Sequence, residues 1–269
     1  MRETPDITTI SILVFVAFWV LAVGVAYAAG RRWARAHTWW RQMAAQWRAA
    51  LALALTFATS LVIGHFDAGS LAGGVLWGAA IFCQALFGFA LARGIGKFEP
   101  LPVVRATRRR EHIWRQAGLM LLVALLVVPG TIVASVVGTV ISQGFFHEAY
   151  RTVASTSLFP SNRWLTFFSL LAGAGIAEET LFRLVALSLI WRLSGSRWLA
   201  ILLSAALFGA YHLSPIDSFY LTFWQFPLRQ FFSSMLAGVL LGYVYVKRGY
   251  ETAVLGHTLS DWIPLLLAA

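Results

Sequence analysis

The sequence is poor in charged residues and in cysteine. Charged side chains make up 12% of the 269 residues and hydrophobic ones 59%, whereas an ordinary soluble domain is roughly 25% charged. The single cysteine, Cys83, lies within an apolar run, which excludes a disulfide framework within the chain and a zinc site built on several thiolates. No internal repeat or low-complexity segment is evident. The composition therefore predicts an all-α membrane protein rather than a soluble domain.

Acidic residues are scarcer than basic ones. The chain has 11 Asp and Glu against 21 Lys and Arg, which gives a formal net charge of +10. A basic chain can indicate a nucleic-acid partner. Here the basic residues lie in short segments between apolar runs and do not cluster on one soluble face. We therefore expect no nucleic-acid partner and interpret the basic residues as signals of membrane topology.

Apolar runs occupy most of the chain, and a helix needs about 20 apolar residues to cross a bilayer. Each run is bounded by charges, Gly or Pro, as helix ends usually are. The runs are 10–29, 47–63, 71–91, 117–140, 164–189, 198–213, 231–246 and 253–267. They predict a polytopic bundle of about eight transmembrane helices, the second, sixth, seventh and eighth being short.

The basic residues also predict how the bundle is oriented. Sixteen of the 21 Lys and Arg lie in four alternate connections, 30–48, 92–116, 190–197 and 247–252. The other connections and the amino-terminal end contain four. Short loops rich in Lys and Arg favour the cytoplasmic side. We therefore expect both termini on the non-cytoplasmic side of the membrane.

One apolar run carries three charged residues, Glu178, Glu179 and Arg183, all within 164–189. An ionisable group at membrane depth costs roughly 2.5–3.5 kcal/mol on insertion scales, so three such groups need partners, a water-filled cavity, or both. Glu179 and Arg183 are four residues apart with the acid first, which favours an ion pair on a helix. Glu178 then remains unpaired. A carboxylate beside a cation in low dielectric suits general acid-base chemistry.

Two further apolar runs carry a histidine each. His212 lies toward the end of the sixth run, one helical turn after Phe208. His257 lies near the start of the last run, one turn before Asp261. Residues four apart share a helix face. Because each polar group in lipid must find a partner, these side chains on separate helices indicate a functional site.

Together these residues resemble the three motifs of the CPBP family of intramembrane proteases. The family includes the eukaryotic Rce1-type CAAX endopeptidases and bacterial relatives implicated in bacteriocin processing and self-immunity. The motifs read Glu178-Glu179-x-x-x-Arg183, Phe208-x-x-x-His212 and His257-x-x-x-Asp261. The resemblance covers roughly residues 164–261. It implies a helical membrane domain with a polar intramembrane cavity, in which a peptide bond of a membrane-associated protein or peptide is hydrolysed.

The resemblance also implies roles for the residues that match the first two motifs. Glu178 would activate the attacking water, with Glu179 and Arg183 as its partners. His212 would orient the same water. No cofactor is needed for this glutamate-dependent mechanism, which we favour.

The third motif departs from the family's usual form, in which histidine and asparagine make an oxyanion site. His257 matches, but position 261 is aspartate. An ionised aspartate only accepts hydrogen bonds, so either Asp261 is protonated, or it holds His257 in a donating tautomer, or the site binds a cation. In the last case two histidines with Glu and Asp form a plausible Zn²⁺ ligand set. Zinc is thus the alternative cofactor.

The polar residues also divide the chain into two parts. Residues 1–161 contain no comparable intramembrane polar set, and we expect them to form an accessory half of about four helices. Residues 162–269 form the predicted catalytic half. The predicted partners are membrane lipids and the substrate, and the predicted location is a bacterial cytoplasmic membrane.

Two other classes of function use similar residues. A proton- or ion-coupled transporter could relay protons through them, but the sequence lacks the matched, broken halves that many transporters have. A catalytically inactive family member could act as a binding or immunity protein. Such a protein would be free to lose Glu178, His212 and His257, all of which are present.

Overall fold

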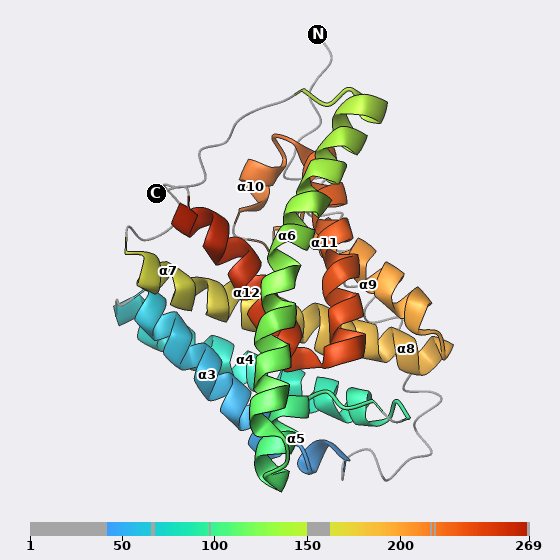
Figure 1. Ribbon diagram of the computed structural model, residues 1–269. Helices are drawn as coiled ribbons and strands as arrows, with labels where there is room; N and C mark the ends of the chain where they lie inside the picture. The colour runs from blue at the N-terminus through green and yellow to red at the C-terminus, as the bar shows by residue number, and fades with distance from the viewer. Residues whose placement is uncertain are drawn as a thin grey trace.

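The computed structural model describes residues 42–65, 68–96, 98–149, 162–215, 217 and 219–267, and every regular element among them is a helix (Figure 1). This confirms the all-α class. The elements are α3 (Trp47–His65), α4 (Ala68–Arg93), α5 (Pro102–Arg109), α6 (Ile113–Phe146), α7 (Arg163–Leu170), η2 (Leu171–Glu178), η3 (Thr180–Leu187), α8 (Ser188–Ser194), α9 (Arg197–Tyr211), α10 (Tyr220–Phe223), α11 (Pro227–Arg248) and α12 (Tyr250–Leu267).

Seven of the eight predicted apolar runs lie in these helices, and the run 10–29 lies outside the described residues. In the described part, three helices are long and apolar enough to cross a membrane, with windows Trp47–Gly64, Leu71–Arg93 and Ile113–Phe146. Helix α9 is apolar but shorter. The predicted count of about eight spans is therefore not confirmed.

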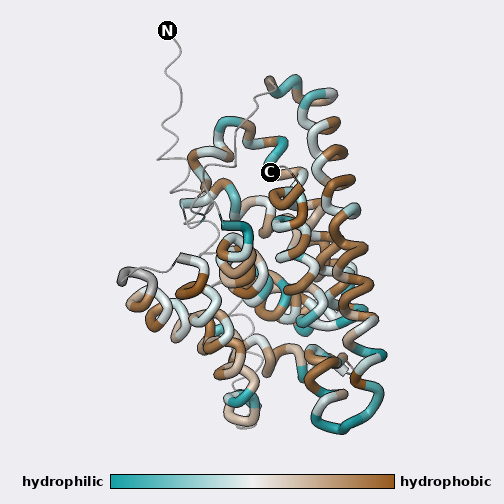
Figure 2. Tube along the Cα trace, turned by 60° about the vertical axis from the view of Figure 1, so that its left-hand side comes forward, coloured by the Kyte–Doolittle hydropathy of each residue, from teal (hydrophilic) through white to brown (hydrophobic). Residues whose placement is uncertain are grey.

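Helix α6 shows why the molecule suits a lipid environment. Only 22% of its most apolar window is buried inside the protein, so most of a 34-residue apolar helix faces outward. Soluble proteins rarely expose an apolar surface of this size to water. Figure 2 shows that the long helices are mainly hydrophobic along their length, while hydrophilic residues gather near their ends.

The stretch that carries the first motif lies at the centre of the bundle. From Leu171 to Leu187 the backbone is wound almost entirely as π-helix, in the two segments η2 and η3 that meet at Glu179. Helices α3 and α12 pack against η2, and α4 and α9 pack against η3. π-Helical turns are rare and concentrate at functional sites.

Close packing against this stretch depends on one glycine. A Cβ atom on Gly175 would meet Thr258 Oγ1 and sit 3.4 Å from the carbonyl oxygen of Val254. Both neighbours belong to α12. Gly175 therefore lets α12 approach η2 closely enough for their polar side chains to meet.

Two buried tyrosines, one at the start of α12 and one in α11, also contact the π-helical stretch. The hydroxyl of Tyr250 lies 2.7 Å from Thr180 Oγ1, and that of Tyr245 lies 2.6 Å from Ser188 Oγ. These two helical side chains are eight residues apart, one near the start of η3 and the other just beyond its end. The tyrosines thereby fix the position of η3 between them.

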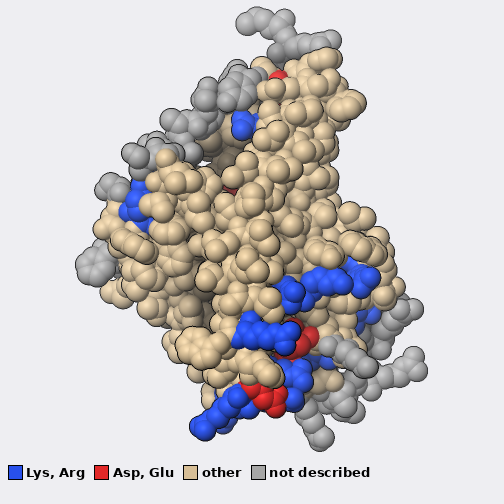
Figure 3. All heavy atoms as spheres, viewed as in Figure 1, with Lys and Arg blue, Asp and Glu red and all other residues tan. Residues whose placement is uncertain are grey.

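Charged side chains lie mainly at one end of the bundle. Figure 3 shows Lys and Arg gathered around the end that carries α5 and the last turn of α11. At this end Glu251 of α12 accepts hydrogen bonds from the backbone N–H groups of Val103 and Val104, both at 2.8 Å. The carboxylate thus caps the amino terminus of α5, where the helix dipole favours negative charge.

Candidate active site

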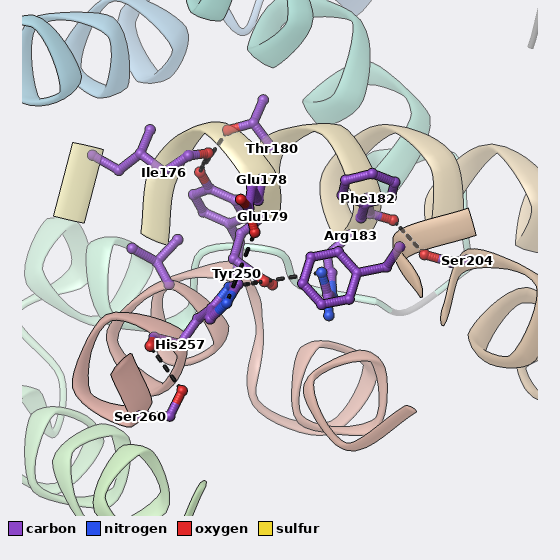
Figure 4. A network of polar contacts seen from close by, with 12 residues as sticks. Ile176, Glu178, Glu179, Thr180, Phe182, Arg183, Ser204, Tyr250, His257 and Ser260 are labelled. Atoms are coloured by element: carbon purple, nitrogen blue, oxygen red, sulfur yellow. Dashed lines mark hydrogen bonds and ion pairs between the residues drawn. The ribbon is translucent and has the colours of Figure 1, made fainter. Parts of the chain in front are cut away.

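The centre of the site is an ion pair between two residues of the first motif (Figure 4). Arg183 Nη1 lies 3.0 Å from Glu179 Oε1, and their side chains are 1% and 0% exposed. The pairing that the sequence predicted is therefore present. The Arg183 guanidinium also lies over the ring of Phe208, 4.4 Å from its centroid, a cation–π contact that gains strength when desolvated.

The same carboxylate oxygen holds the histidine of the third motif. His257 Nδ1 lies 2.8 Å from Glu179 Oε1, and Figure 4 shows the imidazole reaching from α12 toward the glutamate pair. A carboxylate only accepts, so His257 donates from Nδ1. Glu179, and not Asp261, is thus the group that orients this ring.

Glu178 has a different environment from its neighbour. Its side chain is 17% exposed, and its Oε2 lies 3.9 Å from His257 Nε2. That distance is too long for a hydrogen bond. Glu178 therefore faces the far side of the same imidazole that Glu179 anchors, and it keeps access to its surroundings.

His212 approaches Glu178 from the carboxyl-terminal cap of α9. Its Nδ1 lies 2.9 Å from the carbonyl oxygen of Phe208. A carbonyl only accepts, so Nδ1 carries the hydrogen, and Nε2 of the neutral ring is an acceptor. The rings of His212 and His257 both contact Phe208, with centroid distances of 4.7 and 5.6 Å. The second and third motifs therefore meet around one phenylalanine.

Asp261 lies at the rim of the site. Its Oδ2 is 3.7 Å from His257 Nε2, and its side chain is 40% exposed. His257 Nε2 thus faces two carboxyl groups, Asp261 and Glu178. An imidazole with a carboxyl group near each nitrogen can donate from both, which is what an oxyanion site requires.

One acidic residue of the site, Asp217, was not identified from the sequence. Asp217 follows α9 in the connection to α10, and its side chain is 6% exposed. Its Oδ2 lies 4.0 Å from His212 Nε2, and its Oδ1 accepts the backbone N–H of Phe219 at 2.7 Å. Periodicity cannot find such a residue, because it lies outside a helix. The available signal was only its position five residues after His212.

Glu178, His212 and Asp217 form the one group in the described part of the chain with spacing suited to a metal ion. One ligand atom from each lies within 4.8 Å of the others, and His257 and Asp261 do not belong to the group. Zinc ligands at about 2.0–2.2 Å in tetrahedral array are about 3.4 Å apart. The 4.0 Å between His212 Nε2 and Asp217 Oδ2 exceeds this. This group could hold a metal ion, but zinc would require these two atoms to lie closer together than they do here.

Comparison with known proteins gives one family match, over part of the chain. Residues 160–263 match the family model described as type II CAAX prenyl endopeptidase Rce1-like. The match spans all three motifs and confirms the resemblance that they predicted. No curated protein and no solved structure matches the chain. The family match and the apolar helices together indicate an integral membrane protein.

Proposed function

We propose that this chain is an intramembrane endopeptidase that hydrolyses a peptide bond of a membrane-associated protein or peptide by glutamate-dependent activation of water. The observation that carries the proposal is the contrast between the two adjacent glutamates. Glu179 is fully buried and bound to both Arg183 and His257. Glu178 is partly exposed, faces two histidines, and forms no comparable ion pair or hydrogen bond with another described residue.

In the proposed reaction Glu178 removes a proton from the attacking water. The water oxygen forms a bond to the scissile carbonyl carbon, while its second O–H stays intact and donates a hydrogen bond to His212 Nε2, which fixes the direction of attack. His257 Nε2 donates to the oxygen that becomes negative. When the carbon–nitrogen bond breaks, Glu178 returns its proton to the leaving nitrogen.

The positions of the other residues support these roles. Glu179 and Arg183 hold the His257 ring so that Nε2 points toward Glu178. His212 is fixed by the carbonyl of Phe208 with its acceptor nitrogen on the Glu178 side. We propose that no metal takes part, in accord with spacings that exceed those of zinc ligands. Metal-dependent hydrolysis is the alternative that measurements of metal content distinguish.

The proposed location is a bacterial cytoplasmic membrane, with both termini on the non-cytoplasmic side. Membrane lipids and the substrate are the proposed partners. The concentration of Lys and Arg at the α5 end of the bundle supports this orientation (Figure 3), because basic ends favour the cytoplasm.

The decisive experiment replaces Glu178 by glutamine. Purified parent and Glu178→Gln proteins are placed in proteoliposomes with a fluorogenic peptide library carrying a lipid anchor, and cleavage is followed by mass spectrometry. We expect Glu178→Gln to lose at least a thousandfold in activity while its yield and thermal unfolding match the parent, since the substitution keeps shape and removes only the base. Undiminished cleavage by this variant would refute the assignment.

A further inference from the structure

Three polar side chains of the site, Glu178, His212 and Asp217, converge on one point. The lone pair of His212 Nε2 faces Asp217 Oδ2 at 4.0 Å. A carboxylate oxygen of Glu178 completes a triangle whose sides do not exceed 4.8 Å. The 4.0 Å between His212 Nε2 and Asp217 Oδ2 is too long for a direct hydrogen bond. A water molecule between them could hydrogen-bond to all three.

A single water molecule fits this triangle. Two hydrogen bonds of about 2.8 Å that meet at a tetrahedral angle end on atoms about 4.6 Å apart. The 4.0 Å between His212 Nε2 and Asp217 Oδ2 lies below that value, and the 4.8 Å upper limit on all three separations lies above it. A buried water also needs two to four polar partners, and the three residues provide them from η2, α9 and the connection after α9.

The hydrogen-bond count then assigns a role to Asp217. A water donates two hydrogens and accepts through two lone pairs. If it donates to Glu178 and His212, the third neighbour must donate to it, and the remaining lone pair is free to attack a carbonyl carbon. Asp217 can donate only when protonated. Its Oδ1 already accepts the N–H of Phe219 at 2.7 Å, so the proton belongs on Oδ2, the oxygen nearer His212.

We propose that Asp217 is a positioning residue that, as a neutral carboxylic acid, holds the attacking water between Glu178 and His212. This inference rests on the proposed function, because it assigns a third contact to the same water. Burial supports it by raising the pKa of the Asp217 carboxyl to about 7, while the hydrogen bond from Phe219 lowers it. The titratable groups facing Asp217 among the described residues are Glu178 of η2 and Tyr211 and His212 of α9.

Asparagine at this position provides a selective test. In Asp217→Asn the amide oxygen can keep the bond from Phe219 N–H, which directs the amide nitrogen toward the water. The variant should therefore retain the parent's activity at pH 6. Asp217→Ala removes the donor and should lower kcat roughly ten- to hundredfold with little change in KM, since a single positioning hydrogen bond is lost.

The pH profile separates this role from a structural one. The parent should lose activity above about pH 7 as Asp217 ionises, whereas the asparagine cannot ionise. The ratio of Asp217→Asn to parent activity should rise about tenfold between pH 6 and pH 8. Groups that do not interact with Asp217 titrate alike in both proteins and cancel from the ratio.

Glu148→Gln is the matched control. Glu148 is a half-buried carboxylate that accepts N–H groups of Leu228 and Arg229 at 2.8 and 2.7 Å, capping α11 outside the triangle. Its pH profile should match the parent's. Thermal unfolding of each variant shows whether the fold is retained.

The outcomes are distinct for the two proposals. If Glu178→Gln is active, the proposed function fails. If Glu178→Gln is inactive but Asp217→Ala is fully active, or the Asp217→Asn ratio is independent of pH, the role of Asp217 is wrong while the glutamate mechanism stands. Loss of activity in Asp217→Asn at every pH would show that an ionised aspartate is required, and would also overturn the inference.

Discussion

Replacing Glu179 by glutamine should destabilise the protein far more than the same change at Glu178. Glu179 is fully buried, and one of its oxygens contacts both Arg183 at 3.0 Å and His257 at 2.8 Å. Glutamine keeps the size of the side chain but removes its charge. Arg183, which is also fully buried, is then left as a cation with no carboxylate at its Nη1.

The cost of leaving one partner of a buried ion pair unpaired sets the size of the effect. Removing one partner costs about 3–5 kcal/mol, because an uncompensated charge stays in low dielectric. Replacing both partners by neutral groups is often close to neutral. Glu179→Gln/Arg183→Met should therefore regain most of the stability that Glu179→Gln loses. Both variants should be inactive, since neither holds His257 through a carboxylate.

The assay is denaturant unfolding in mixed micelles, followed by tryptophan fluorescence, with cleavage measured on the same samples. Glu178→Gln is the matched control, because it makes the same chemical change one residue away on a partly exposed side chain. We expect it to alter the free energy of unfolding by less than about 1 kcal/mol. The reasoning is refuted if Glu179→Gln is as stable as Glu178→Gln, or if the double variant is less stable than Glu179→Gln.

Two further predictions concern chemistry and topology. Asp261→Asn should keep or raise activity, because the amide supplies a donor at the rim of the oxyanion site. A metal chelator should leave the activity of the parent unchanged. The glutamate mechanism would be contradicted if the parent contained stoichiometric zinc and activity were lost both in Asp261→Asn and in the parent treated with chelator. Tags at both termini should be accessible from outside intact cells. Single cysteines placed in 92–116, after replacement of Cys83, should be protected from a membrane-impermeant thiol reagent in intact cells. Labelling of that loop in unbroken cells would overturn the orientation.

Much of the site could be predicted from the sequence because charged side chains cost free energy at membrane depth. Charges at membrane depth are rare enough that Glu178, Glu179 and Arg183 mark a functional stretch by themselves. Helical spacing then gave the pairing of Glu179 with Arg183, which the structure contains at 3.0 Å. The resemblance of the motifs provided the grouping with His212 and His257, and these rings do meet around Phe208.

The remaining features depend on contacts between elements, which periodicity does not report. The bond between Glu179 and His257 joins residues 78 positions apart, and sequence reasoning assigned the orientation of His257 to Asp261 as one alternative. Asp217 lies beyond the end of α9 and follows no repeat. The π-helical winding from Leu171 to Leu187 leaves no distinctive residue pattern in the chain. The division at residue 161 stays a prediction.

The adjacency of the two glutamates explains how one stretch can be both stable and reactive. Consecutive residues of a helix point in different directions, so Glu178 and Glu179 can face different surroundings although their backbones are joined. Glu179 turns toward Arg183 and α12 and is neutralised there. Glu178 turns toward the triangle with His212 and Asp217. The buried pair fixes the backbone at Glu179, where η2 and η3 meet, and thereby positions the reactive carboxylate, which lies outside this pair and 3.9 Å from His257 Nε2. A base that is held by its neighbour and not by its own bonds keeps both its position and its capacity to accept a proton.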